Sequence, residues 1–201
     1  MCSGPDSMAW QKRLRFWARR GLGDLREAAR RRWFRLAFMR RRLRRRAFQA
    51  WQEGTIGFVC FGNICRSPFA ERLAAQHLDR GRRTLSAGYF PESGRRAPAL
   101  AVTVAGRLGV DLEDHRSRLL DDDFVELCDS IFVFDEDNYR TLVREHPAAK
   151  GRVHFLGALS EHEPLFVPDP FGGQAEDYEL IYGRISRMIA RVGASAPPPS
   201  P

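Results

Sequence analysis

The pattern that most restricts the fold is an alternation of short apolar runs with longer amphipathic segments. Four apolar runs with strand-like composition occur at residues 55–61, 82–88, 129–135 and 152–157. The segments with helical spacing of apolar residues lie at 68–78, 97–108, 138–145 and 175–192. Strands that alternate with helices form a parallel sheet with helices on both faces. We therefore predict an α/β fold in which ligands bind at the carboxyl ends of the strands.

Charge divides the chain into a basic extension and an acidic body. Residues 1–50 carry a net charge of +13 from 16 basic and 3 acidic residues. Residues 51–201 carry a net charge of −5 from 17 basic and 22 acidic residues. We predict a basic Arg/aromatic-rich extension over 1–50, a globular domain over 54–193 and a disordered Pro-rich tail over 194–201. The extension is expected to be helical or disordered, because tryptophan and leucine recur at helical spacing among its arginines.

The four cysteines are too few for a disulfide framework and suit a reducing compartment. No Cys/His cluster has zinc-like spacing, so we expect no metal and no cofactor. No window approaches the roughly 20 apolar residues of a membrane-spanning helix, and the first residues lack the apolar core of a signal peptide. We expect a cytoplasmic protein whose basic extension can also place it at the membrane periphery.

The most informative loop lies within GFVCFGNICRSPFAE, residues 57–71, where an apolar strand leads into a polar loop and then a helix. Cys60 and Arg66 bracket five residues, a length that lets backbone N–H groups point inward as an anion-binding nest. The helix that follows adds its own N–H groups and the positive end of its dipole. Arg66 can bind two phosphate oxygens, and the positive field favours the thiolate form of Cys60. The loop therefore predicts covalent phosphoryl transfer to sulfur.

Neighbouring residues fit the same chemistry. Gly62 permits close backbone approach, and Asn63 tolerates left-handed geometry better than most non-glycine residues. The Ser67 hydroxyl can donate to the thiolate and improve it as a leaving group. An acid must also protonate the leaving oxygen, and Asp169 in VPDPF lies between two prolines that fix the direction of its carboxylate.

Five sequence blocks resemble, in the same order, the low-molecular-weight protein tyrosine phosphatase family over residues 54–193. They are VCFGNICRSPFAE, SAG at 86–88, GVDLEDHRSRLL at 109–120, FDEDN at 134–138 and PDPF at 168–171. The resemblance implies a four-stranded parallel sheet of flavodoxin-like winding, flanked by helices on both faces. It also implies a protein-tyrosine-phosphatase, a hydrolase that acts through a cysteinyl-phosphate intermediate.

The same resemblance implies a role for each site residue. Cys60 would be the nucleophile, Arg66 the phosphate clamp, and Asp169 the general acid and then base. His115 would support the loop, and Cys65 would form a reversible disulfide with Cys60 on oxidation. The pocket wall would be aromatic, from Phe171 with Tyr89 or Phe90. The implied substrate-binding residues are Phe61, Gly62, Asn63, Ile64, Cys65, Ser67 and Phe171.

Alternatives stay open at this point. A thioredoxin-coupled arsenate reductase shares the implied fold but needs two further cysteines, and only Cys128 lies in the relevant region. A protein arginine phosphatase carries threonine where this loop has Ile64. The non-enzymatic alternative is binding of residues 9–50 to an anionic membrane surface or an acidic partner, with nucleic acid last in this order. The family further implies a phosphotyrosine protein substrate, in bacteria often a tyrosine kinase of polysaccharide export.

Overall fold

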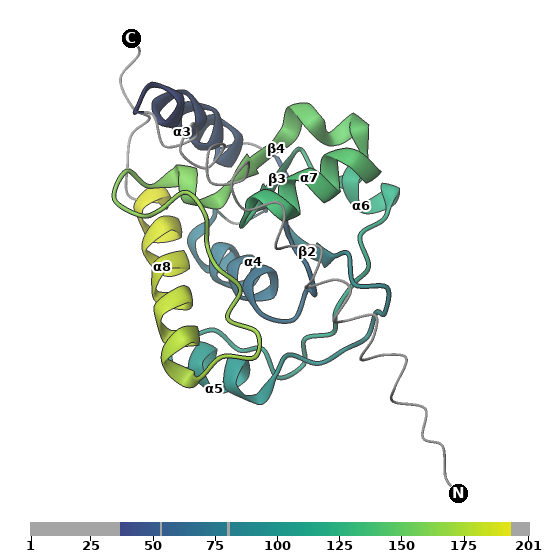
Figure 1. Cartoon of the computed structure of the whole chain (residues 1–201), viewed down its shortest axis with the longest axis vertical. Coiled ribbons are helices and arrows are strands. Elements are labelled where there is room, and N and C mark those ends of the chain that lie inside the picture. Colours follow the sequence, from purple (N-terminus) through teal and green to yellow (C-terminus); the bar gives the residue numbers. More distant parts are fainter. Residues whose placement is uncertain (1–36, 53, 80, 194–201) are drawn as a thin grey trace, which may run out of the picture. The chain divides into compact units, whose positions relative to one another are not determined.

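A computed structural model describes residues 37–52, 54–79 and 81–193 (Figure 1). In this part of the chain, four parallel strands form one sheet in the order β2-β1-β3-β4. The strands are β1 (Ile56–Cys60), β2 (Thr84–Gly88), β3 (Ser130–Val133) and β4 (Val153–Phe155). Each lies within a predicted apolar run, and the order is that of a flavodoxin-like sheet. The predicted α/β fold is therefore confirmed.

Helices cover both faces of this sheet. The predicted ones are α4 (Arg66–His77), α5 (Ala99–Arg107), α7 (Glu136–Glu145) and α8 (Ala175–Gly193). Figure 1 shows α4, α5 and α8 on one side of the sheet, with α7 on the other beside α6 (Asp122–Leu127). Sequence periodicity did not predict α6, η1 (Pro147–Arg152) or η2 (Leu156–Leu159), because such short helices contain too few apolar repeats.

The last turns of α3 (Ala37–Trp51) belong to the compact unit that holds the sheet, which begins at residue 41. The Trp51 side chain is 2% exposed and packs edge-on against Phe58 and Phe132, with ring centroids 6.1 and 5.4 Å away. These two phenylalanines are cross-strand neighbours on β1 and β3. The end of α3 therefore packs into the core of the sheet, and the predicted domain boundary at residue 54 stays a prediction.

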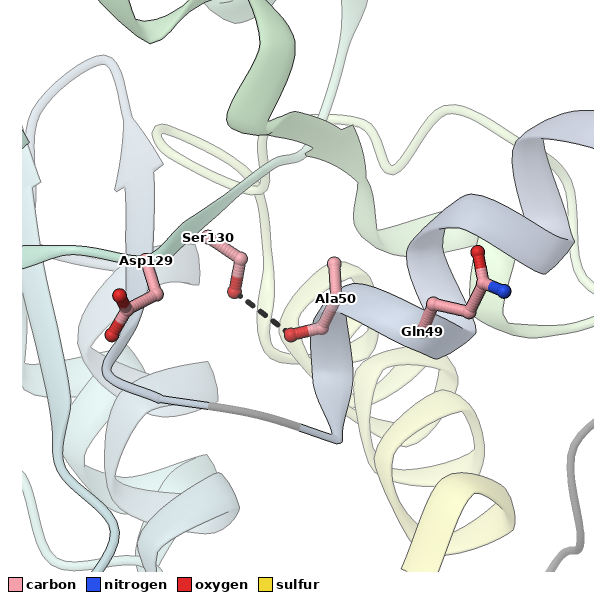
Figure 2. Close-up of a pocket in the computed structure, with 4 residues that line it drawn as sticks. All are labelled: Gln49, Ala50, Asp129 and Ser130. Carbon is pink, nitrogen blue, oxygen red and sulfur yellow. Dashed lines mark hydrogen bonds between the residues drawn. The ribbon is translucent and has the colours of Figure 1, made fainter.

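The junction between α3 and β3 contains the pocket of Figure 2, lined by Gln49, Ala50, Asp129 and Ser130. The Ser130 hydroxyl donates to the Ala50 carbonyl oxygen at 3.1 Å, and Asp129 accepts from the backbone N–H of Thr55 at 2.7 Å. These bonds lie at the amino ends of β1 and β3, opposite the end where parallel sheets bind ligands. The bond from Ser130 to Ala50 thus joins α3 to the sheet.

Within the described ranges, no helix is long and apolar enough to cross a membrane. The same residues hold no group of three or more His, Cys, Asp or Glu side chains arranged to bind a metal ion. The expectations for residues 1–36 and for the tail at 194–201 lie outside the described residues and stay predictions.

Candidate active site

The candidate phosphate-binding loop connects the carboxyl end of β1 to the start of α4. Every residue of β1 is buried, and the strand ends at Cys60. Helix α4 begins at Arg66, two residues before the predicted start at Pro68. Cys65 precedes the helix and makes no side-chain cap bond, so it leaves the first N–H groups of α4 uncapped. The loop thus presents backbone N–H groups and a helix N-terminus to an anion.

Asn63 holds the loop in its turned form. Its φ of +49° lies in the left-handed region, and the residue is fully buried. Its side-chain amide donates to the hydroxyls of Ser67 and Ser86, both at 2.8 Å, and its Oδ1 accepts from the backbone N–H of Arg118 at 2.7 Å. Burial lowers the pKa of His115, whose Nε2 lies 2.7 Å from the Asn63 carbonyl oxygen. A neutral ring must donate from Nε2 to that oxygen.

The directions of these bonds aim a hydroxyl hydrogen at Cys60. Because the NH2 group of the Asn63 side chain can only donate, the Ser67 oxygen accepts there and keeps its own hydrogen for Cys60 Sγ, 3.0 Å away. Ser86 accepts from the same amide and donates to Glu71 at 2.5 Å. Ser86 and Glu71 are absent from the predicted site, although Ser86 lies in the SAG block. A thiolate at Cys60 would therefore accept a hydrogen bond from a positioned serine.

Arg66 closes the other end of the loop. Its side chain is 2% exposed, and Nη1 donates to Asp135 Oδ2 at 2.6 Å and to the Val167 carbonyl at 3.0 Å. Nη2 donates to Asp169 Oδ2 at 2.8 Å. Burial alone would lower the pKa of Arg66, but the two carboxylates outweigh it and raise the pKa above its usual range. The guanidinium therefore stays charged.

One edge of this guanidinium remains for a ligand. The Nε of Arg66 is buried and has no hydrogen-bond partner among the described residues. A guanidinium binds phosphate best with two adjacent N–H groups directed at two oxygens. The arrangement therefore fits a phosphoryl group between Arg66 and the loop N–H groups.

The two carboxylates come from different loops at the same end of the sheet. Asp169 is partly exposed between Pro168 and Pro170, and its Oδ1 accepts from the Phe171 N–H at 3.3 Å. Asp135 lies two residues after the end of β3 and caps α7 by accepting from the Asn138 N–H at 2.8 Å. Asp135 was not among the predicted site residues. Its position just after a strand that neighbours β1 was the signal that could have found it.

Cys65 lies below the loop surface. It is buried, its Sγ is 3.8 Å from the Tyr178 hydroxyl oxygen, and burial raises its pKa. Cys65 is therefore a neutral thiol, and both Cys60 and Cys65 are free in this structure. The reversible disulfide between them stays a prediction.

Aromatic side chains border the site. Phe61 is 44% exposed and Phe171 56% exposed, whereas Ile64 is buried. The Phe61 ring meets Phe90 edge-on, with centroids 5.9 Å apart. Tyr89 instead directs its hydroxyl to the Asn138 carbonyl oxygen at 2.6 Å. Of the two residues predicted to complete the wall, Phe90 is thus the one whose ring packs against an aromatic side chain of the loop.

The glycine of the SAG block, Gly88, is required for a steric reason. A Cβ added at Gly88 would lie 2.7 Å from the Asn63 nitrogen and 2.8 Å from the Phe61 carbonyl oxygen. That same oxygen accepts the N–H groups of Tyr89 and Phe90, at 2.8 and 3.0 Å. Only glycine lets the end of β2 approach the loop this closely.

Comparison with known proteins places this chain in a family. Residues 55–194 match the family model described as low molecular weight phosphotyrosine protein phosphatase. The chain is 36% identical over 135 residues to the probable low molecular weight protein-tyrosine-phosphatase EpsP of Ralstonia nicotianae, covering 67% of this chain and 90% of that protein. It is 33% identical over 129 residues to the low molecular weight protein-tyrosine-phosphatase Etp of Escherichia coli, covering 64% and 85%.

Solved structures agree with these sequence relatives. The fold is similar to that of the tyrosine phosphatase AmsI of Erwinia amylovora, with a TM-score of 0.64, 30% identity, and coverage of 69% of this chain and 90% of that one. It is also similar to the YwlE arginine phosphatase of Geobacillus stearothermophilus, with a TM-score of 0.65, 28% identity, and coverage of 71% and 92%.

Proposed function

The chain belongs to the low molecular weight phosphotyrosine protein phosphatase family, and we propose that Cys60, Arg66 and Asp169 carry out its hydrolysis of phosphotyrosine. One observation supports this assignment most strongly. The charged guanidinium of Arg66 and the carboxylate of Asp169 are joined at 2.8 Å, at the end of the loop that begins with Cys60. The loop of Cys60 and the separate loop of Asp169 thus bring a thiol, a guanidinium and a carboxyl group to the carboxyl end of β1.

The first step forms a bond between the Cys60 sulfur and phosphorus. The Cys60 thiolate attacks the phosphoryl group, which is held by the loop N–H groups and the Nε edge of Arg66. The bond between phosphorus and the tyrosine oxygen breaks, and Asp169 gives its proton to that oxygen. A bound phosphoryl dianion competes with Asp169 for the N–H groups of Arg66.

The second step regenerates the enzyme. The Asp169 carboxylate removes a proton from a water molecule as the water oxygen attacks phosphorus. The phosphorus–sulfur bond breaks, inorganic phosphate leaves, and Cys60 returns as a thiolate. The Ser67 hydroxyl, 3.0 Å from the sulfur, stabilises this leaving group by donating a hydrogen bond.

The remaining predicted residues take supporting roles in this proposal. Asn63 and His115 hold the loop backbone through the bonds described above. Phe61 and Phe171 flank the entrance, where they would stack on the tyrosine ring. Gly62, Ile64, Cys65 and Ser67 complete the loop around the phosphoryl group.

The test is steady-state hydrolysis of a phosphotyrosine peptide by the full chain, without metal and with a reductant. Cys60→Ser should abolish turnover while inorganic phosphate still binds. Cys128→Ser is the matched control, because Cys128 is a buried free thiol outside the site, whose pKa burial raises to about 12. Equal turnover in Cys60→Ser and the wild type would remove Cys60 from the mechanism.

Phosphoarginine is an alternative substrate, because the proteins similar to this chain include arginine phosphatases. The buried Ile64 supports tyrosine, since the arginine phosphatase branch is expected to carry threonine at this loop position. Initial rates on phosphoarginine and phosphotyrosine at equal concentration discriminate the two. Arsenate-dependent oxidation of thioredoxin tests the reductase alternative in the same way.

The substrate protein and the basic extension complete the proposal. A tyrosine kinase of polysaccharide export is the candidate substrate that the family membership suggests. The favoured partner of residues 9–50 is an anionic membrane surface. An acidic partner is the second candidate, and nucleic acid is the third. The described part of that segment supports an anionic partner, because α3 carries four exposed arginines: Arg41, Arg42, Arg45 and Arg46.

These four arginines have no ion-pair partner in the described part of the chain, whereas the partly exposed Arg44 pairs with Glu161. Sedimentation with anionic vesicles tests the membrane contact. The full chain should sediment, and a variant with glutamine at all four positions should stay largely in the supernatant. The matched control carries glutamine at four exposed arginines elsewhere, Arg83, Arg107, Arg144 and Arg191. Equal sedimentation of both variants would contradict a role for this helix face.

A further inference from the structure

A second arginine lies beside the candidate site and has no part in the mechanism above. Arg95 follows Gly94 in the loop between β2 and α5. Its guanidinium stacks on the Phe90 ring, 3.9 Å from the centroid, and Phe90 in turn meets Phe61 edge-on. Its Nη2 donates to the Gly62 carbonyl oxygen at 2.5 Å. Arg95 is thus attached to the phosphate-binding loop two residues after Cys60.

The position of this guanidinium is well determined by its surroundings. Nε donates to the Glu92 carbonyl oxygen at 3.1 Å. The backbone on either side is held by Ser117, whose hydroxyl accepts the Arg95 N–H at 3.0 Å and whose own N–H donates to the Arg95 carbonyl at 2.9 Å. A ligand that binds here meets a side chain already fixed in one place, so little conformational entropy is lost on binding.

The charge of Arg95 is not neutralised within the described part of the chain. Both of its side-chain hydrogen bonds go to carbonyl oxygens, and no ion pair joins it to a carboxylate there. Arg66, in contrast, has two carboxylate partners. Arg95 is only partly buried, and two of its five N–H groups are engaged, which leaves three N–H donors for an anion.

We propose that Arg95 is a specificity-determining residue that binds a carboxylate of the phosphoprotein, on an Asp or Glu that flanks the phosphotyrosine. This inference rests on the proposed function, because it places the phosphotyrosine in the loop of Cys60. Neighbouring residues of an extended peptide are roughly 3.5 Å apart, so a residue beside the phosphotyrosine reaches the Gly62 side of the loop. A planar guanidinium binds a carboxylate through two parallel charge-assisted bonds. The substrate class is thus a phosphotyrosine segment with acidic neighbours.

The test compares phosphotyrosine peptides that differ only in having Glu or Gln on each side of the phosphotyrosine. On the wild type we expect kcat/KM to be about tenfold higher with Glu, mainly through KM, which corresponds to one charge-assisted contact. In Arg95→Gln the ratio of the two peptides should fall to about one. Arg96→Gln, which alters the exposed neighbouring arginine, should keep the wild-type ratio. Because each ratio is taken on one enzyme, a general loss of loop order cancels from it.

The outcomes distinguish a failure of the proposed function from a failure of the role of Arg95. No turnover of either peptide by the wild type would overturn the proposed function itself. Turnover with equal kcat/KM for both peptides would overturn only the role of Arg95. A Glu preference that persists in Arg95→Gln would also overturn it. The Glu preference should shrink as salt is raised from about 0.05 to 0.5 M, since salt screens a partly exposed ion pair.

Discussion

Replacing Trp51 by alanine tests whether the end of α3 is part of the core that includes the sheet. The Trp51 side chain is 98% buried against Phe58 and Phe132. A side chain of this size buries about 200 Å² of surface, which at about 25 cal/mol per Å² corresponds to about 5 kcal/mol as an upper value. Buried tryptophan-to-alanine changes typically cost about 3–5 kcal/mol. We expect the free energy of unfolding to fall by about 4 kcal/mol.

The assay is urea denaturation of the full chain, followed by tyrosine fluorescence or circular dichroism. Gln52→Ala, at the exposed next position, is the matched control and should change the free energy of unfolding by less than about 0.5 kcal/mol. The folded fraction of Trp51→Ala should keep the wild-type kcat, because the tryptophan contacts the sheet and not the loop of Cys60. A loss of stability below about 1 kcal/mol would refute the packing of α3 as part of the core.

Three further predictions concern the site and pH. Arg66→Lys should lower kcat/KM for phosphotyrosine by about 100-fold or more, because an ammonium cannot bind phosphate with two parallel N–H groups; wild-type kinetics would contradict the clamp role. Asp169→Ala should slow hydrolysis by about 100-fold, more for aryl phosphates with poor leaving groups, and equal slowing for all leaving groups would argue against its role as an acid. Burial, with a smaller contribution from Arg46, lowers the pKa of His154 from 6.5 to about 4. Its unfolded form therefore binds the proton first as pH falls, so the free energy of unfolding should decrease by about 2 kcal/mol between pH 7.5 and 5. His154→Gln should remove this decrease when the free energy of unfolding is measured by urea titration at each pH. An unchanged pH dependence in the variant would contradict the role of His154.

Local patterns in the sequence were sufficient for most of the fold. The strands could be predicted because each is a short, wholly or largely buried apolar run followed by a turn or a helix start. Helix starts were less well predicted. Helix α7 begins at Glu136 rather than at the predicted Asn138, because the side chain of Asp135 caps it. The short α6 was missed, although Asp121 caps it by accepting from the Phe124 N–H.

The residues of the candidate site likewise divide into those that local sequence predicts and those that it does not. One short loop and the first turn of the helix after it contain four of the site residues, so the sequence alone brings them together: Cys60, Asn63, Arg66 and Ser67. Asp169 could be proposed only because a phosphoryl-transfer loop needs an acid, and its bond to Arg66 joins residues that are 103 positions apart. The only local signal for Asp135 was its position after a strand, and Arg95 had none.

By itself, the sequence determined the family, from the order of five short blocks. It also determined the parallel α/β fold and the strand–loop–helix of Cys60 and Arg66, since these depend on patterns within about fifteen residues. Only the tertiary structure decided which distant groups meet at the carboxyl ends of β1 and β3. It brought Asp135 and Asp169 onto Arg66, and it placed Arg95 on the Gly62 carbonyl. It also made Trp51 part of the core. The physical reason is that contacts between distant segments are set by strand order and packing, which no short stretch of sequence specifies.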